Sequence, residues 1–142
     1  MSGFSACQGV GEADTEVLVP DVLVVDDQIE NCRPLVRLLR AMGRNAAWVT
    51  SGPAALKYLQ EQPTRLVILD VMMRGMDGME VLKRIRAEPQ LERLPVVMFS
   101  ALSDEARVSE AHRLGAQDYL VKASTDFEML RKTVDEQLGH IQ

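Results

Sequence analysis

Cysteine, histidine and long apolar runs are all scarce in this chain, and each shortage excludes a class of protein. The two cysteines, Cys7 and Cys32, have no metal-ligand spacing and are not expected to pair, which fits a reducing, cytoplasmic compartment rather than a disulfide scaffold. No apolar run approaches the roughly 18 residues of a membrane span, and the N-terminus lacks the basic and apolar regions of a secretory signal. We therefore expect no membrane association.

Strong positive charge is absent as well. The 142 residues carry a formal net charge of −5 without a dense basic cluster, so we expect no direct contact with nucleic acid. Hydrophobic residues make up 46% of the chain and charged residues 26%, the proportions of one globular domain with a sizeable core. Residues 1–20 are rich in glycine, serine and small polar residues and are predicted to form a flexible arm, and residues 140–142 a short C-terminal tail.

Four apolar runs have the unalternating composition of strands buried on both faces, as in a parallel sheet. A weaker run, residues 45–49, has Trp48 as its only large apolar side chain and is predicted to be an edge strand. The four strong runs are residues 22–25, 66–70, 94–99 and 118–121.

A helix is predicted after each strand, because apolar residues recur there at helical spacing. Pro34 is expected in the first turn of the first helix. Two capping-box patterns, Asp77-x-x-Glu80 and Thr125-x-x-Glu128, indicate the starts of the third and fifth helices. Five strand–helix pairs with short connections predict an α/β fold, a parallel sheet with helices on both faces.

Polar groups suited to phosphate or metal chemistry stand at the ends of the four strong strands. They are Asp26 with Asp27, then Asp70, Ser100 and Lys122. Ligands of open α/β sheets bind outside the carboxyl ends of the strands, so these groups are expected to converge on one site.

The chemistry of these groups points to metal-assisted phosphoryl transfer. Three carboxylates without imidazole or thiolate form a hard oxygen site that suits Mg²⁺ or Mn²⁺. Asp70 stands alone on the central strand and is the predicted nucleophile, which would form an aspartyl phosphate. Asp26 and Asp27 would hold the metal, while Lys122 and Ser100 would bind the remaining phosphoryl oxygens.

Five segments carry a resemblance to a known family, in order and at matching intervals. They are Leu23-Val24-Val25-Asp26-Asp27, Leu69-Asp70-Val71-Met72-Met73, Gly75-Met76-Asp77-Gly78, Phe99-Ser100-Ala101 and Asp118-Tyr119-Leu120-Val121-Lys122. Together they resemble the receiver domain of two-component response regulators, and the likeness assigns residues 21–139 to such a domain. It implies a flavodoxin-like, doubly wound sheet of five parallel strands in the order 2-1-3-4-5, with five helices.

The resemblance also implies partners and a metal site. Asp70 would accept a phosphoryl group from a phosphohistidine on a sensor histidine kinase or a histidine phosphotransfer protein, as in phosphorelay signal transduction. Asp26, Asp27, Asp70 and the backbone carbonyl of Met72 would hold Mg²⁺.

The resemblance further implies a switch. Ser100 and Lys122 would bind the phosphoryl oxygens, and Tyr119 would move inward as Ser100 shifts. The face formed by the fourth helix, fifth strand and fifth helix would then bind a downstream protein partner. The domain would assist its own phosphorylation and dephosphorylation without being an enzyme, and a homodimer is left open.

Two other functions compete with the phosphorylated switch. A pseudo-receiver that binds partners without chemistry would be expected to lack one or more of the five polar residues, and all five are present. A phosphohydrolase using Asp70 would carry a general acid two residues later, where this chain has Met72. Both a single-domain regulator and a receiver that is part of a longer protein fit the sequence.

Two positions depart from the family pattern. Arg74 stands where the family often has proline, and it either adds positive charge at the entrance of the site or is simply solvated. Ala123 follows Lys122 where the family usually has a proline with a cis peptide bond, and a non-proline cis bond costs about 2.5–4 kcal/mol. The Lys122–Ala123 bond is therefore either trans, with the lysine aimed differently, or cis and strained. His112 lacks partner spacing and is expected on the surface of a helix, whereas His140 is expected in the C-terminal tail without a role.

Overall fold

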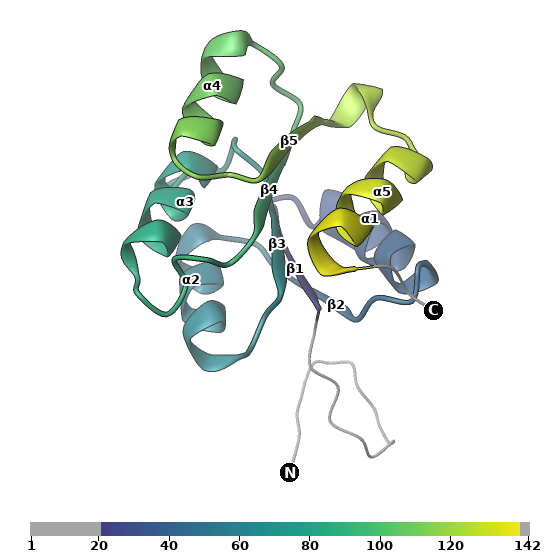
Figure 1. Cartoon of the computed structure of the whole chain (residues 1–142), viewed down its shortest axis with the longest axis horizontal. Helices are drawn as coiled ribbons and strands as arrows, with labels where there is room; N and C mark the ends of the chain where they lie inside the picture. The colour runs from purple at the N-terminus through teal and green to yellow at the C-terminus, as the bar shows by residue number, and fades with distance from the viewer. Residues whose placement is uncertain (1–20, 140–142) are drawn as a thin grey trace.

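A computed structural model describes residues 21–139, in which five strands alternate with five α-helices (Figure 1). The predictions for the arm, the tail, Cys7 and His140 lie outside the described residues. The strands are β1 (Val22–Val25), β2 (Ala46–Val49), β3 (Leu66–Leu69), β4 (Val96–Ser100) and β5 (Asp118–Val121). The helices are α1 (Ile29–Ala41), α2 (Gly52–Glu61), α3 (Gly78–Ala87), α4 (Glu105–Arg113) and α5 (Phe127–Leu138), with a 3₁₀ turn, η1 (Lys122–Ser124), before α5.

The strands form one parallel sheet in the order β2-β1-β3-β4-β5, so the predicted doubly wound topology is confirmed. Every residue of β1 and β3 is buried, which explains why these two runs are apolar without alternation. Strand β2 pairs with β1 alone, and its last three residues are only partly buried. Its predicted edge position is therefore confirmed.

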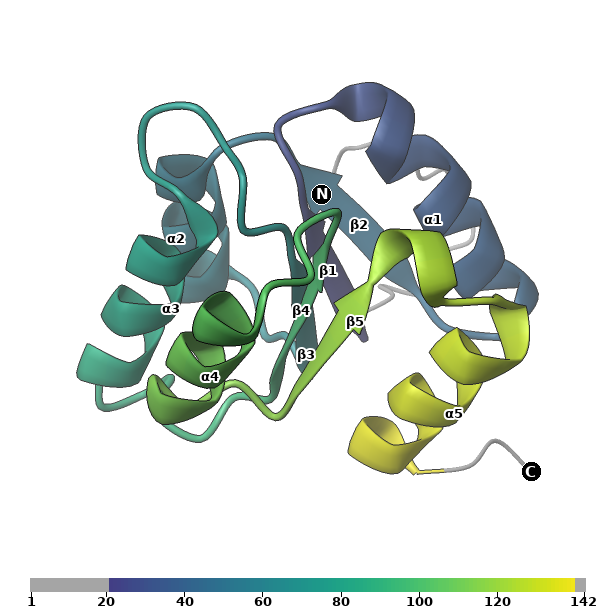
Figure 2. The ribbon, with the colours of Figure 1, turned by 90° about the horizontal axis from the view of Figure 1, so that it is seen from above.

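Two apolar layers flank the sheet, and each combines side chains from alternate strand positions with one set of helices. Helices α2, α3 and α4 cover one face, and α1 and α5 cover the other (Figures 1 and 2). Because both faces are covered, the chemistry of the domain must lie at the ends of the strands or on the outer surfaces of the helices.

The predicted place of Pro34 in the first turn of α1 is wrong. The helix begins at Ile29, so Pro34 lies in the second turn. The early start has a local cause: Asp26 Oδ1 accepts a hydrogen bond from the Gln28 N–H at 2.9 Å, and the Gln28 carbonyl accepts one from the Asn31 N–H at 2.9 Å. The strand-end carboxylate thus helps to begin the helix that follows it.

The predicted cap of α5 is wrong by one residue. Asp126, not Thr125, caps the helix, and its carboxylate accepts a hydrogen bond from the Met129 N–H at 2.9 Å. The Thr125 hydroxyl instead donates to the Val121 carbonyl at 2.7 Å. The η1 turn takes up the residues in between and delays the start of the helix.

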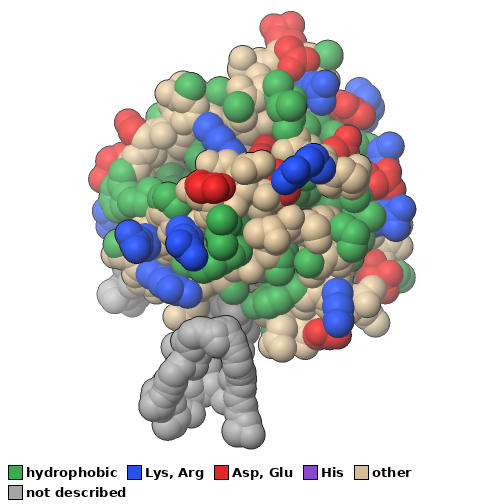
Figure 3. Space-filling view, turned by 180° about the vertical axis from the view of Figure 1, so that it is seen from behind, with side chains coloured by type: hydrophobic (Ala, Val, Ile, Leu, Met, Phe, Trp, Pro, Cys, Tyr) green, Lys and Arg blue, Asp and Glu red, His purple; other side chains and the backbone are tan. Residues whose placement is uncertain are grey.

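The outer surface carries mixed charge. On the face drawn in Figure 3, acidic and basic side chains are interspersed with apolar ones. His112 is exposed on α4, as predicted. Across residues 21–139, no helix combines the length and the apolar character that a membrane span requires.

Candidate functional site

The carboxyl end of the sheet brings together three of the predicted strand-end groups. Asp26 follows β1, Asp70 follows β3 and Lys122 follows β5. The Lys122 ammonium nitrogen, Nζ, lies 2.8 Å from Asp26 Oδ2 and 3.5 Å from Asp70 Oδ2. Both carboxylates are buried, so the ammonium offsets two negative charges that have lost most of their hydration.

Asp26 is held on several sides. Its Oδ1 accepts hydrogen bonds from the Gln28 N–H at 2.9 Å and from Asn31 Nδ2 at 3.4 Å. Its backbone carbonyl accepts one from the Cys32 thiol at 3.3 Å. Burial, followed by the nearby Asp26 charge, raises the pKa of that thiol to about 11, so Cys32 stays protonated and donates. Apart from the helical spacing of Cys32, no feature of the sequence indicated this contact.

Asp70 is a buried acid that lies close to the Lys122 ammonium. Its Oδ1 accepts a hydrogen bond from the Met72 N–H at 3.3 Å. Burial raises its pKa above the ordinary value, and the Asp26 charge adds to that effect, while Lys122 opposes it. A carboxylate in these surroundings gains from any further positive charge that approaches.

Helix α3 begins directly against the Asp70 strand end. A Cβ at Gly78 would lie 2.1 Å from the Asp70 carbonyl oxygen, so only glycine fits there. The Gly78 N–H donates to the Val71 carbonyl at 2.8 Å and closes the loop between β3 and α3. Gly75, with φ +77°, forms the turn at its tip. Gly75 is thus required by the turn, whereas Gly78 is required by close packing against the backbone.

Asp27 contacts a different cationic residue from the one that Asp26 and Asp70 share. Its Oδ2 accepts hydrogen bonds from the Arg74 backbone N–H at 2.9 Å and from Arg74 Nε at 3.4 Å. Arg74 therefore contacts a predicted metal ligand as well as being solvated, with 85% of its side chain exposed. Within residues 21–139, no three histidine, cysteine or acidic side chains lie together as a ready metal cluster.

Ser100 and Tyr119 are linked through one residue. Ser100 is fully buried, and its Oγ accepts a hydrogen bond from the Leu102 N–H at 3.2 Å. The Tyr119 hydroxyl donates to the Leu102 carbonyl at 2.9 Å. Burial raises the pKa of Tyr119 above its ordinary value, so the phenol keeps its proton for this bond.

The lysine geometry left open by the sequence is resolved. No cis peptide bond occurs in residues 21–139, so Lys122–Ala123 is trans. Ala123 lies in the η1 turn, and Lys122 still reaches Asp26 while its ammonium lies 5.7 Å from the centre of the Phe99 ring. Replacing the family's usual proline with alanine leaves the lysine in the site.

The donor set fits a hard divalent cation. Asp26 and Asp70 already share one cationic group, Lys122, and Asp27 stands next to Asp26 at the same strand end. Carboxylate oxygens of this kind are the ligands that Mg²⁺ and Mn²⁺ prefer. A cation bound here would add positive charge to carboxylates that Lys122 and Arg74 already contact.

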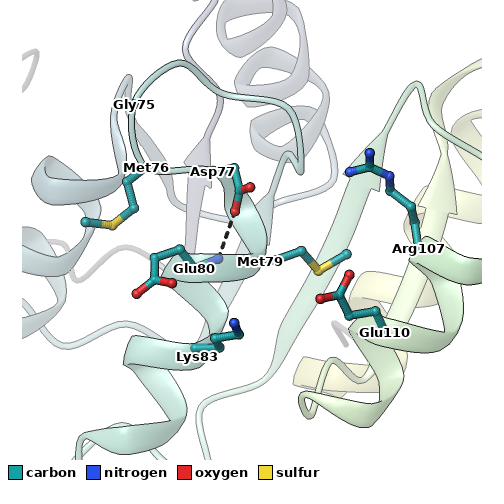
Figure 4. Close-up of a pocket in the computed structure, with 8 residues that line it drawn as sticks. All are labelled: Gly75, Met76, Asp77, Met79, Glu80, Lys83, Arg107 and Glu110. Atoms are coloured by element: carbon teal, nitrogen blue, oxygen red, sulfur yellow. Dashed lines mark hydrogen bonds between the residues drawn. The ribbon is translucent and has the colours of Figure 1, made fainter.

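A shallow groove lies beside the site, between the start of α3 and α4. Figure 4 shows Asp77 bonded to the Glu80 backbone, with Arg107 and Glu110 projecting from α4. None of the strand-end groups lines this groove. The groove is therefore distinct from the set of strand-end groups.

A parallel doubly wound sheet whose carboxyl edge gathers acids, a hydroxyl and a lysine is the architecture of receiver-type signalling domains. The model of the response regulator receiver domain family matches residues 22–135. The chain therefore belongs to that family, which acts in two-component systems, and the resemblance noted in the sequence is confirmed.

Similar proteins agree with this assignment. The transcriptional regulatory protein ZraR of Escherichia coli (strain K12) is 43% identical over 121 residues, which cover 84% of this chain and 26% of ZraR. The chain thus spans about a quarter of the length of that relative. The structure of Vibrio cholerae chemotaxis protein CheY4 is 28% identical, with a TM-score of 0.78, and the match covers 84% of this chain and 99% of CheY4.

A third comparison concerns the metal. The receiver domain of sensor histidine kinase PA1611 from Pseudomonas aeruginosa PAO1 has a magnesium ion coordinated in its active-site cleft. It shares the fold, with a TM-score of 0.77 over 86% of this chain and 99% of that one, at 22% identity.

Proposed function

We propose that this domain is the phosphoryl-accepting switch of a two-component pathway and that Asp70 receives the phosphoryl group. The observation that carries the proposal is the Lys122 ammonium shared between Asp26 and Asp70 at the carboxyl end of the sheet. In such a pair the buried carboxylate supplies the nucleophile, and the lysine supplies a positive charge that binds an incoming phosphoryl group.

The phosphoryl donor is a phosphohistidine on a sensor histidine kinase or a histidine phosphotransfer protein. One carboxylate oxygen of Asp70 attacks the phosphorus, a P–O bond forms, and the P–N bond to the imidazole breaks. The imidazole leaves with the electron pair of that bond and takes up a proton. Lys122 and Ser100 bind non-transferred phosphoryl oxygens, which orients the group and offsets its charge.

The clustered negative charges of the carboxylates explain why phosphorylation would require a divalent cation. Asp26, Asp27, Asp70 and the Met72 carbonyl would hold Mg²⁺, which supplies positive charge to the phosphoryl oxygens when bound. Mn²⁺ satisfies the same donor set. The family and the magnesium-bound relative support this part of the proposal.

The conformational change that would follow phosphorylation starts at Ser100. When Ser100 Oγ turns toward the phosphoryl group, its bond with the Leu102 N–H changes, and the Leu102 carbonyl is the acceptor for Tyr119. A shift of Leu102 would therefore move the tyrosine and remodel the surface of α4, β5 and α5. That surface binds a downstream protein partner in the cytoplasm, and the domain then assists loss of its own phosphate.

Phosphorylation by phosphoramidate, a small donor with a P–N bond, tests these roles. With Mg²⁺ we expect no phosphorylation of Asp70→Asn and slowing of at least about tenfold for Lys122→Ala, since each lost charge contact costs over 1 kcal/mol. Asp77→Asn is the matched control, because Asp77 only caps α3 and is exposed. Equal labelling of Asp70→Asn and wild type would overturn the assignment of the nucleophile.

A further inference from the structure

The three acids of the site are divided between two cationic side chains. Lys122 faces Asp26 and Asp70, whereas Asp27 is bonded to Arg74. The Arg74 contact has two parts, the backbone N–H at 2.9 Å and Nε at 3.4 Å, and both reach Asp27 Oδ2. A single carboxylate oxygen thus holds the loop between β3 and α3 to the turn between β1 and α1.

We infer that Arg74 competes with the divalent cation for Asp27 and so sets the cation affinity of the site. The inference rests on the proposed function, because it takes Asp27 to be a ligand of that cation. Arg74 holds Asp27 Oδ2, and we take this oxygen to be the one that would bind a cation shared with Asp26 and Asp70. Before it can do so, it must leave the Arg74 N–H, the guanidinium or both. The free energy of these contacts is therefore subtracted from that of cation binding.

The end of the loop between β3 and α3 is packed more closely against its neighbours than its tip is. At the end, Gly78 is packed against the Asp70 backbone and bonded to the Val71 carbonyl. At the tip, Gly75 has open space around its Cα and a positive φ. Release of Asp27 would free the tip, with Arg74 on it, without disturbing the start of α3.

The two parts of the contact can be removed one at a time. Arg74→Ala removes the guanidinium, which is 85% exposed, and we expect the Mg²⁺ affinity to rise about threefold, as for an exposed ion pair. Arg74→Pro removes the backbone N–H as well, and we expect a rise of about tenfold because that bond is to a charged acceptor. The order of affinity should be wild type, then Arg74→Ala, then Arg74→Pro.

Titration calorimetry with MgCl₂ at fixed ionic strength measures this order. Arg84→Ala is the matched control: it removes the same charge from an exposed side chain that pairs with Glu80, so its affinity should equal that of wild type. Circular dichroism melting confirms that each variant is folded. An affinity of Arg74→Ala and Arg74→Pro equal to or below that of wild type would overturn the inference.

A second readout separates this inference from the proposed function. In ¹⁵N-resolved NMR, the Arg74 amide signal of the wild type should shift as Mg²⁺ is added, because its acceptor is withdrawn. Mg²⁺ binding with no change at the Arg74 amide would refute the competition and leave the metal site standing. Absence of Mg²⁺ binding in the wild type and all Arg74 variants would remove the metal site itself, and the inference with it.

Discussion

The ammonium of Lys122 lies 2.8 Å from Oδ2 of Asp26, although 96 residues separate the two along the chain. The same ammonium lies 3.5 Å from Asp70, so one partly buried cation offsets two buried anions. This relationship links the ends of β1, β3 and β5, and we expect the stability of the metal-free domain to depend on Lys122, which is also a proposed site residue.

Replacing Lys122 with alanine should destabilise the metal-free domain. Two buried carboxylates would lose their cationic partner, and we expect a loss of about 1–3 kcal/mol, below the full value for a buried pair because the lysine is 24% exposed. Urea unfolding in the presence of chelator measures it, with Lys132→Ala on the exposed side of α5 as control. Equal losses in the two variants would contradict the account.

Replacing Asp70 with asparagine should have the opposite effect without metal. Burial raises the pKa of Asp70, which means that the folded state disfavours its charge, so removing the charge should raise the free energy of unfolding. Added Mg²⁺ should then stabilise the wild type more than the variant, because ligand binding favours the folded state that binds it. If Mg²⁺ raised the free energy of unfolding of the variant as much as that of the wild type, Asp70 would not be a metal ligand.

The bond from Tyr119 to the Leu102 carbonyl should contribute measurably to stability. Tyr119→Phe keeps the ring and removes the donor, and we expect a loss of about 0.5–1.5 kcal/mol at pH 7. The variant should also loosen the segment between β4 and α4, seen as faster amide exchange near Leu102. Unchanged stability together with unchanged exchange would show that the bond contributes nothing.

Ionisation of Tyr119 should lower the stability of the domain at alkaline pH. Burial raises the pKa of Tyr119 above its ordinary value of 10.0, so the folded state binds a proton that the unfolded state releases. The resulting stability is fully present below pH 10 and is lost as the pH rises through the folded-state pKa. Thermal melts of wild type and Tyr119→Phe should therefore converge above pH 10 and differ by a constant amount between pH 7 and 9.

A buried ion pair far from the site should stabilise the end of α5. Arg44 Nη2 lies 2.8 Å from Asp135 Oδ1, the same guanidinium donates to the Gly139 carbonyl, and Arg44 is only 6% exposed. Arg44→Ala should cost about 2–4 kcal/mol, because Asp135 would be left without this cation. Arg37→Ala, on the exposed side of α1, is the control and should cost less than about 0.5 kcal/mol.

Most of the fold could be predicted from the sequence because its signals are local. These signals are the apolar runs of β1 and β3 and the polar residue at each strand end. It also predicted that Asp26, Asp70 and Lys122 would meet, since parallel strands place their carboxyl ends at one edge. The strand order itself came from the family resemblance and was confirmed by the structure.

The remaining features depend on contacts that no local pattern encodes. The bond between Asp27 and Arg74 joins residues 47 positions apart, and the Lys122–Ala123 bond could only be resolved by the path of the chain through η1. The shift of the α5 cap from Thr125 to Asp126 has the same origin, because both residues suit a cap and the η1 turn decides between them.

Intact mass spectrometry after incubation with a small phosphodonor and Mg²⁺ tests whether Asp70 accepts a phosphoryl group. The wild type should gain one phosphoryl group that hydroxylamine removes, as expected for an acyl phosphate. Asp70→Asn, and the wild type with chelator, should gain none. A folded wild type that binds Mg²⁺ yet gains no phosphoryl group from either a small donor or a phosphohistidine protein would contradict the account and favour a pseudo-receiver.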